Sequence, residues 1–241
     1  MATDPSNEVV LSYYNYLLKT SDIALLQGSH WLNDVIIGFY FEYLDEILNK
    51  NERRDFYFIS PELTQLLKMT DPNQYIIFLD PHSITECKCM FFPLNNCDKT
   101  DAAGGTHWSL LIFCKGDKTC YHFDSAKGSN AAIASKFAES VMDCVLDKKE
   151  PNKKFVEVDS PQQSNSYDCG VYVLCLTDVI INHLSFALTL VRQGGIVYSV
   201  HYVKVIIVER ILFYHTRKRS HIYLVIVFFF ALLDSYNAKS V

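Results

Sequence analysis

Apolar positions along the chain fall into two kinds of run, separated by short polar segments. Longer runs with the length or spacing of helices lie at residues 35–44, 61–67, 129–146 and 171–181. Shorter runs with the length of strands lie at residues 75–79, 89–94, 106–114, 119–124 and 155–158. The pattern therefore predicts helices and strands in a chain of 241 residues, long enough for one sizeable domain with a real core.

Polar residues mark where the first two predicted helices begin. Asn33 or Asp34 can cap the helix that follows, which is apolar around most of its circumference and should be buried. Pro61 is suited to the first turn of the next helix. Trp31, just ahead of the first cap, has the position of a residue that staples a helix start, which is one interpretation of it.

Residues 106–124 are predicted to form a β-hairpin around a turn at residues 115–118. If the turn centres on residues 116–117, Ser109 lies opposite Asp124. His107 shares a face with Ser109, so Asp124 becomes its diagonal neighbour at about 7–8 Å between backbones. A slip of one residue in register would place the two side chains on opposite faces.

Cys169 lies where a polar, turn-prone stretch at residues 163–168 becomes an apolar helix. Unpaired N–H groups and the helix dipole stabilise a thiolate at that position. Asp168 can cap the helix, and the Gln163 amide can supply one half of an oxyanion hole. The competing interpretation is a packed core thiol, which we expect for Cys175 on the same helix.

A suitable base decides between the two interpretations of Cys169. A cysteine at a helix start, a histidine on a strand and an aspartate that holds the histidine make a nucleophilic triad. Asp124 would fix the tautomer of His107, and His107 would keep Cys169 as thiolate and later protonate the leaving amine. Gln163 and the backbone N–H of Cys169 would stabilise the oxyanion. His122 is expected to be structural or solvent-facing.

The charge of the chain is unevenly distributed. Its net charge is −5, with 15 basic and 25 acidic side chains in residues 1–181, against seven and two in residues 182–241. An acidic body does not suit nucleic acid, whose phosphates attract the opposite charge. It suits a basic protein partner, because complementary fields speed encounter.

The eight cysteines bear on the compartment. The first ten residues have no apolar segment typical of a secretory signal, so we expect free thiols in a reducing compartment, the cytoplasm or nucleus. Cys87 and Cys89 with Cys97 lack the paired spacing of a zinc site. We therefore expect neither a metal nor a cofactor.

These motifs together resemble the ubiquitin-like-protein proteases, the sentrin/SUMO-specific cysteine proteases. The resemblance rests on His107-Trp108, then Asp124, then the run from Gln163 to Gly170, an order that differs from papain, where the cysteine comes first. Residues 31–34 and 102–111 are more similar still to the small single-domain deneddylases of that family, as is the lack of a long N-terminal extension. The resemblance covers about residues 9–181, which we take as the protease domain.

The resemblance implies an α+β fold of the adenain/Ulp type with a papain-like core, in which helices flank a mixed central sheet. It implies a monomeric peptidase and isopeptidase that cleaves after the C-terminal Gly-Gly of the neddylation modifier (Rub), both in its precursor and on conjugates such as cullins. Trp31 and Trp108 match the walls of a channel that only glycine fits. Asp34 matches an acid that contacts the tail of the modifier, and residues 95–106 match a loop that orders over substrate.

Residues 182–241 depart from the family, which continues with polar, lysine-rich helices. The tail is apolar at residues 196–208, apart from Lys204, and at residues 222–233. The second run has twelve apolar residues, whereas a spanning helix needs about 20, so we expect an alternative or aberrant terminus and no membrane anchor. Three other functions remain open: a SUMO-specific protease, a modifier-binding protein impaired by this tail, and an acyltransferase, which is not expected to need the tryptophan channel.

Overall fold

The computed structural model describes residues 7–48, 55–99, 104–146 and 150–187, with side chains in the last range as far as Ile181. The predicted divergent tail lies outside the described residues, apart from the backbone of its first six positions. Within the described ranges, no helix has the length and apolar character needed to cross a membrane.

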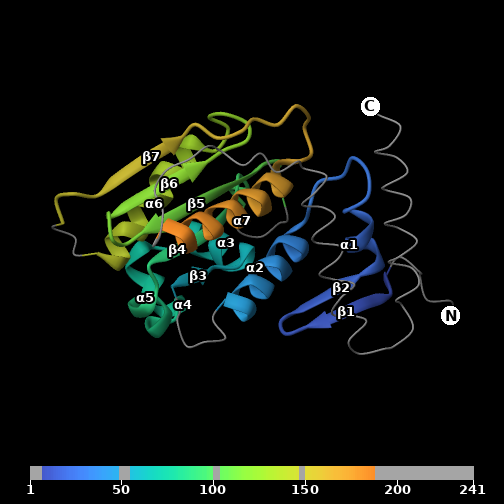
Figure 1. Cartoon of the computed structure of the whole chain (residues 1–241), viewed down its shortest axis with the longest axis horizontal. Helices are drawn as coiled ribbons and strands as arrows, with labels where there is room; N and C mark the ends of the chain where they lie inside the picture. Colours follow the sequence, from blue (N-terminus) through green and yellow to red (C-terminus); the bar gives the residue numbers. More distant parts are fainter. Residues whose placement is uncertain (1–6, 49–54, 100–103, 147–149, 188–241) are drawn as a thin grey trace.

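A mixed five-stranded sheet forms the centre of the molecule (Figure 1). Its strands, in spatial order, are β3 (Phe56–Phe58), β4 (Cys89–Asn95), β5 (Trp108–Cys114), β6 (Thr119–Phe123) and β7 (Lys154–Val158). The two outer pairs are parallel and the two inner pairs are antiparallel. Together with the helices on its faces, this sheet confirms the expected α+β class.

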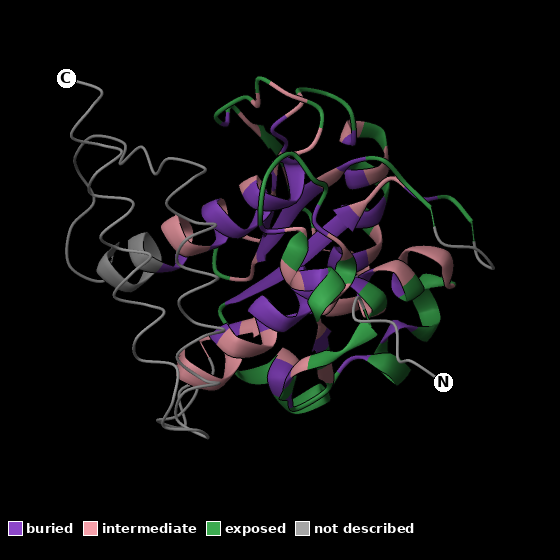
Figure 2. Cartoon of the chain, turned by 90° about the vertical axis from the view of Figure 1, so that its right-hand side faces the viewer, coloured by how far each residue is buried: buried purple, intermediate pink, exposed green. Residues whose placement is uncertain are grey.

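Two groups of elements cover the two faces of the sheet. One face carries α2 (Asp34–Leu48) and α7 (Cys169–Ala187). The hairpin of β1 (Val9–Tyr13) and β2 (Tyr16–Lys19), followed by α1 (Thr20–Ala24), packs against α2. The other face carries α3 (Pro61–Met69), the 3₁₀ turn η2 (Pro72–Gln74), α4 (Tyr75–Phe78), α5 (Pro81–Glu86) and α6 (Ala131–Val145). The buried residues follow the sheet and the inward sides of these helices (Figure 2).

The central strands are apolar on both faces because helices cover both. On β4, Phe91 packs in the core beneath α2 and α7, whereas Phe92 packs in the core beneath α6. On β5, Ile112 and Leu111 divide between the same two cores. Alternate side chains of a strand point to opposite faces, so two-sided burial explains why these strands are continuous apolar runs.

The predicted helix starts are confirmed. The side chain of Asn33 accepts a hydrogen bond from the backbone N–H of Ile36 at 3.0 Å, as a cap at the start of α2 should. Ser60 does the same for Leu63 at 3.1 Å, with Pro61 in the first turn of α3.

The predicted strand at residues 75–79 is wrong, because this segment forms the short helix α4. Tyr75 and Leu79 are buried, whereas the three residues between them are exposed. Burial every fourth residue is the period of a helix. The Tyr75 ring lies 6.2 Å from the Phe137 ring on α6, which shows that this one-turn helix is held by tertiary packing.

The predicted register of the hairpin is confirmed. Cys114 pairs with Thr119 and Leu110 pairs with Phe123, so the next pair outward is Ser109 with Asp124. His107 lies just before β5 and Asp124 just after β6. Both residues are therefore delivered to the same end of the sheet.

Candidate active site

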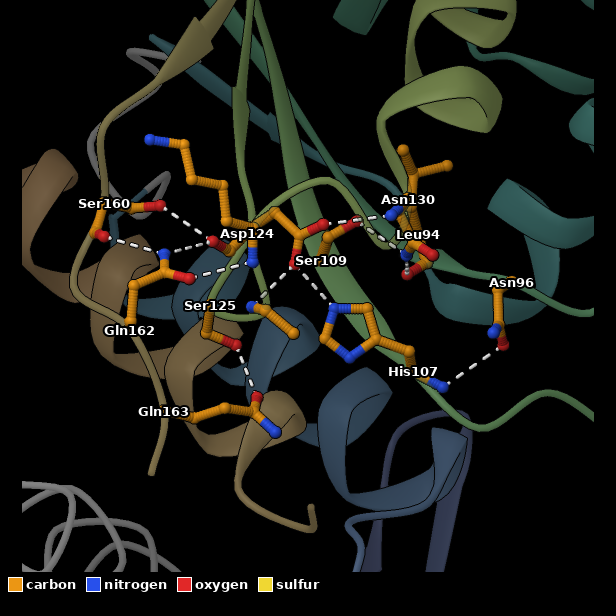
Figure 3. A network of polar contacts seen from close by, with 12 residues as sticks. Leu94, Asn96, His107, Ser109, Asp124, Ser125, Asn130, Ser160, Gln162 and Gln163 are labelled. Carbon is orange, nitrogen blue, oxygen red and sulfur yellow. Dashed lines mark hydrogen bonds and ion pairs between the residues drawn. The ribbon is translucent and has the colours of Figure 1, made fainter. Parts of the chain in front are cut away.

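The side chains of His107 and Asp124 are in direct contact (Figure 3). Nε2 of His107 lies 2.6 Å from Oδ1 of Asp124, and both residues are buried, at 7% and 3% exposure. The other ring nitrogen, Nδ1, is therefore not engaged by Asp124. The carboxylate fixes the ring tautomer, since it can only accept a hydrogen from Nε2.

The charges of this pair are set by its surroundings. Burial lowers the pKa of His107, but hydrogen bonds to Asp124 and to the Cys169 thiol outweigh burial and raise it to about 9. Burial likewise opposes ionisation of Asp124, yet hydrogen bonds from His107 and from the backbone of Asn130 and Ala126 hold its pKa below its ordinary value. Imidazolium and carboxylate are therefore both favoured at neutral pH.

Cys169 is the first residue of α7, as the sequence predicts, and is 2% exposed. The carbonyl of Asp168 accepts the N–H of Tyr172 at 3.0 Å, which makes Asp168 the residue that opens the helix. Its carboxylate accepts a hydrogen bond from the Asn165 side chain at 2.8 Å. The thiol thus lies at a helix start, where backbone N–H groups have no partner within the helix, and the His107 ring is within hydrogen-bonding reach of it.

Gln163 is held in one orientation beside this helix start. The Ser125 hydroxyl donates to its Oε1 at 2.7 Å (Figure 3), and its Nε2 donates to the carbonyl of Asn165 at 2.6 Å. An amide nitrogen carries two hydrogens, so one of them remains for a ligand. The role of Gln163 in an oxyanion hole stays a prediction, with Ser125 fixing which end of the amide is the donor.

A groove of about 660 Å³ runs past the thiol. Its lining includes five residues that the sequence singled out, which are Trp31, Asp34, His107, Trp108 and Cys169. Gly104 and Gly105 border the same groove. The structure thus brings the predicted nucleophile, its base and all three predicted substrate-binding residues to one cavity, while Asp124 lies behind the histidine.

Both tryptophans in the groove are fixed by their ring nitrogens. Nε1 of Trp31 donates to the carbonyl of Ser166 at 2.6 Å, in the loop that leads to the thiol. Nε1 of Trp108 donates to the carbonyl of Leu32 at 3.2 Å. Trp31 is nevertheless 47% exposed, which is unusual for a large aromatic side chain whose only role is to staple a helix start.

Asn96 is a part of the site that sequence reasoning missed. Its Oδ1 accepts the backbone N–H of His107 at 3.2 Å (Figure 3). It also accepts the backbone N–H of Thr106 at 2.7 Å, which joins the two ends of the loop between β4 and β5. Asn130, which donates to Asp124, was missed as well. In the sequence both are asparagines in polar segments, where turn and cap positions commonly hold that residue.

All eight cysteines are free thiols, as expected. Cys175 is 8% exposed and packs in the core, which confirms its predicted role. His122 is fully buried and hydrogen-bonded, so of the two predicted alternatives it is a structural residue and not a solvent-facing one. In the part of the chain that the structure describes, no three histidine, cysteine or acidic residues gather in a way that could hold a metal ion.

Residues 30–190 match the Ulp1 protease family, C-terminal catalytic domain. The chain belongs to the Ulp1 protease family. It is accordingly a cysteine protease, and Cys169, His107 and Asp124 remain the residues that we predict to carry out its chemistry.

Other members of the Ulp1 family give the same picture. The chain is 42% identical over 173 residues to sentrin-specific protease 8 of Homo sapiens, covering 71% of this chain and 81% of that protein. It is 30% identical over 187 residues to NEDD8-specific protease 1 of Arabidopsis thaliana, covering 77% and 80%. A solved Ulp1 protease domain in complex with Smt3, the yeast ortholog of SUMO, superposes with a TM-score of 0.66 at 21% identity and covers 86% of this chain and 87% of that one, which supports the fold.

Proposed function

We propose that this Ulp1-family protease cleaves after the C-terminal Gly-Gly of a NEDD8-type modifier, both in its precursor and on modified lysines, with cullins among its conjugates. A relative named for this substrate favours it over SUMO, because NEDD8-specific protease 1 of Arabidopsis thaliana is 30% identical over 77% of this chain. The SUMO-protease structures share the fold at lower identity.

The groove carries this proposal. It is bordered by Trp31 and Trp108 and reaches the Cys169 thiol, and both indoles are tied to backbone carbonyls. A chain passing between such rings must lack a side chain, so glycine suits the last positions before the scissile bond. Asp34 is exposed at the same groove and is the acid we assign to the tail of the modifier.

The proposed reaction begins with the thiolate of Cys169, paired with the imidazolium of His107. The sulfur attacks the carbonyl carbon of the terminal glycine, and the oxyanion that forms receives hydrogen bonds from the Cys169 N–H and from Nε2 of Gln163. Nδ1 of His107 then protonates the departing amine as the carbon–nitrogen bond breaks, which leaves a thioester. A water deprotonated by the same nitrogen hydrolyses the thioester, while Asp124 remains a carboxylate throughout.

We assign the protease domain to residues 9–181 and treat residues 182–241 as a divergent tail. The acidic balance of residues 1–181 supports a basic protein as partner and not nucleic acid. Eight free thiols support action in a reducing compartment, the cytoplasm or nucleus, and we expect a monomer without cofactor.

Cleavage of three precursors by the full chain tests the substrate. NEDD8, SUMO and ubiquitin, each with a short C-terminal extension, are compared by kcat/KM, with Cys169→Ala as the inactive control. We expect NEDD8 to be preferred by at least about 100-fold, which corresponds to about 3 kcal/mol of differential transition-state binding. Preference for SUMO would keep the chemistry and overturn the substrate, and no cleavage by a folded sample would contradict both.

Asp34→Asn tests the assigned tail contact in the same assay. Because Asp34 is exposed, this variant should fold normally, and its KM for the NEDD8 precursor should rise about 3- to 10-fold with kcat nearly unchanged. Asp159→Asn, an exposed aspartate that does not border the groove, is the matched control. An unchanged KM for Asp34→Asn would remove Asp34 from the substrate site.

A further inference from the structure

Asn130 occupies an unusual position just ahead of α6. An asparagine at the N-cap of a helix normally accepts an N–H of the first turn through its side chain. Here the side chain makes no capping bond and turns into the sheet, where Nδ2 donates to the Ser109 hydroxyl at 2.8 Å and to the carbonyl of Leu94 at 3.3 Å (Figure 3). The residue is fully buried.

This placement is costly for the fold. Oδ1 of Asn130 is buried and has no hydrogen-bond partner among the described residues, and a buried acceptor left unpaired is unfavourable. If the Asn130 side chain capped α6, its Oδ1 would have a hydrogen-bond partner and the helix would gain its cap. The position of Asn130 therefore needs an explanation outside α6.

That explanation is the carboxylate of Asp124. The backbone N–H of Asn130 donates to Oδ2 of Asp124 at 2.9 Å, while Oδ1 receives the His107 ring and the N–H of Ala126. The side chain of Asn130, anchored on Ser109, decides where its own N–H points. Ser109 thus helps to position the Asp124 carboxylate indirectly, by anchoring Asn130.

The chain of hydrogen bonds continues beyond Ser109. Its hydroxyl lies 2.9 Å from Nε2 of His122, and Nδ1 of His122 lies 2.7 Å from a carboxylate oxygen of Glu157 on β7. A carboxylate can only accept, so in the neutral ring Nδ1 carries the hydrogen and Nε2 accepts the Ser109 hydroxyl. The lone pairs of the Ser109 hydroxyl then accept the hydrogen bond from Asn130. In this series of hydrogen bonds each residue thus donates to the next one toward Glu157.

We propose that Glu157, His122, Ser109 and Asn130 form a positioning chain that holds Asp124 against His107. None of the four borders the groove, so they act through Asp124 and touch no substrate. The inference rests on the catalytic roles proposed for Asp124, His107 and Cys169, and it adds a second histidine–carboxylate pair behind the first.

Ser109→Ala removes the central hydrogen-bonding group of the positioning chain. Without Ser109, Asn130 holds the Asp124 carboxylate less firmly, and the hydrogen bond from His107 to Asp124 weakens. The pKa of His107 then falls from about 9 toward its ordinary value of 6.5. We expect kcat to fall about 10-fold, KM to change less than about 2-fold, and the alkaline limb of the kcat/KM profile to move to lower pH. The pKa of His107 itself is measured by NMR on the full chain labelled at histidine.

Ser83→Ala is the matched control for Ser109→Ala. Ser83 is also a buried serine whose hydroxyl is hydrogen-bonded, to Asp80 at the start of α5, and it borders no part of the groove. The same loss of a buried hydroxyl should lower stability there without moving the pKa of His107. A merely structural role for Ser109 predicts that the two variants behave alike.

Glu157 provides a second variant that keeps the test valid if Ser109→Ala folds poorly. Its side chain is 43% exposed, so Glu157→Ala should fold. We expect a kcat loss of about 3-fold with the same direction of shift in the pKa of His107, and recovery in Glu157→Gln, whose amide oxygen still accepts from Nδ1 of His122.

The NMR measurement separates failure of this proposal from failure of the proposed function. A lowered His107 pKa in Ser109→Ala and Glu157→Ala, absent in Ser83→Ala, supports the positioning chain even if the wild type proves inactive, which would overturn only the catalytic assignment. An unchanged His107 pKa and kcat in Ser109→Ala and Glu157→Ala would overturn the positioning chain.

Discussion

Asp124→Asn should inactivate the enzyme by a route that the structure specifies. Asp124 accepts three hydrogen bonds, from Nε2 of His107 and from the N–H groups of Ala126 and Asn130. An asparagine has one accepting oxygen and one donating nitrogen, so either orientation sets its amide hydrogens against a backbone N–H. With the nitrogen beside the ring, it donates to Nε2 and forces the ring hydrogen onto Nδ1, which then cannot take the thiol proton.

The magnitude follows from two effects. With a pKa of about 9, His107 is about 97% protonated at pH 7.5, whereas at its ordinary value of 6.5 it would be about 9% protonated, so lost charge alone lowers activity by at most about 10-fold. The wrong tautomer adds a further factor, and triads in which aspartate is replaced by asparagine lose about 10⁴-fold in kcat. We therefore expect kcat/KM to fall between about 10²- and 10⁴-fold at pH 7.5.

The assay is the pH dependence of NEDD8-precursor cleavage, alongside the rate at which iodoacetamide alkylates Cys169. In the wild type, activity should fall above about pH 9 as His107 loses its proton, and in Asp124→Asn this limb should move to lower pH. Asp159→Asn, the same substitution at an exposed aspartate, should leave both rates unchanged. A loss below about 3-fold, or an unmoved alkaline limb, would show that Asp124 does not set the charge and tautomer of His107.

Three further variants test other parts of the site. Gln163→Ala should lower kcat about 10²-fold with little change in KM, measured by steady-state cleavage, because it removes a donor to the oxyanion; an equal rise in KM would instead indicate a role in binding. Gly105→Ala should lower the thermal midpoint and the activity, because Gly105 has a φ of +86° and a Cβ there would lie 1.7 Å from Oδ1 of Asn95, whereas Gly116→Ala has open space and should change neither. Trp31→Ala should raise KM about 10-fold, because it removes one wall of the groove; cleavage kinetics that match the wild type would contradict the channel.

The site could be predicted because its parts depend on local rules. The pairing of Ser109 with Asp124 follows from the turn, and a confirmed register places His107 within reach of Asp124. The position of Cys169 follows from the change of a polar loop into an apolar helix. Both features depend on residues that are close together in the sequence, so they can be predicted without the structure.

Other parts of the molecule depend on packing between distant segments. Residues 75–79 have the composition of a strand, and only burial of Tyr75 against α6 makes them a helix. Asn130 has the sequence position of a helix cap, and only the neighbouring strand explains why its side chain turns inward. His122 is distinguished from His107 by its hydrogen bonds to Ser109 and Glu157, which the hairpin pattern does not reveal.

The proposed activity depends on one step, in which Cys169, activated by His107, attacks the C-terminal glycine of a NEDD8-type modifier. The most direct measurement incubates the full chain with NEDD8 that carries a C-terminal electrophile and maps the adduct by peptide mass spectrometry. We expect one adduct, on Cys169, abolished in Cys169→Ala and retained in Cys175→Ala, which alters a buried thiol on the same helix. An adduct on another cysteine, or none on a folded sample, would contradict it.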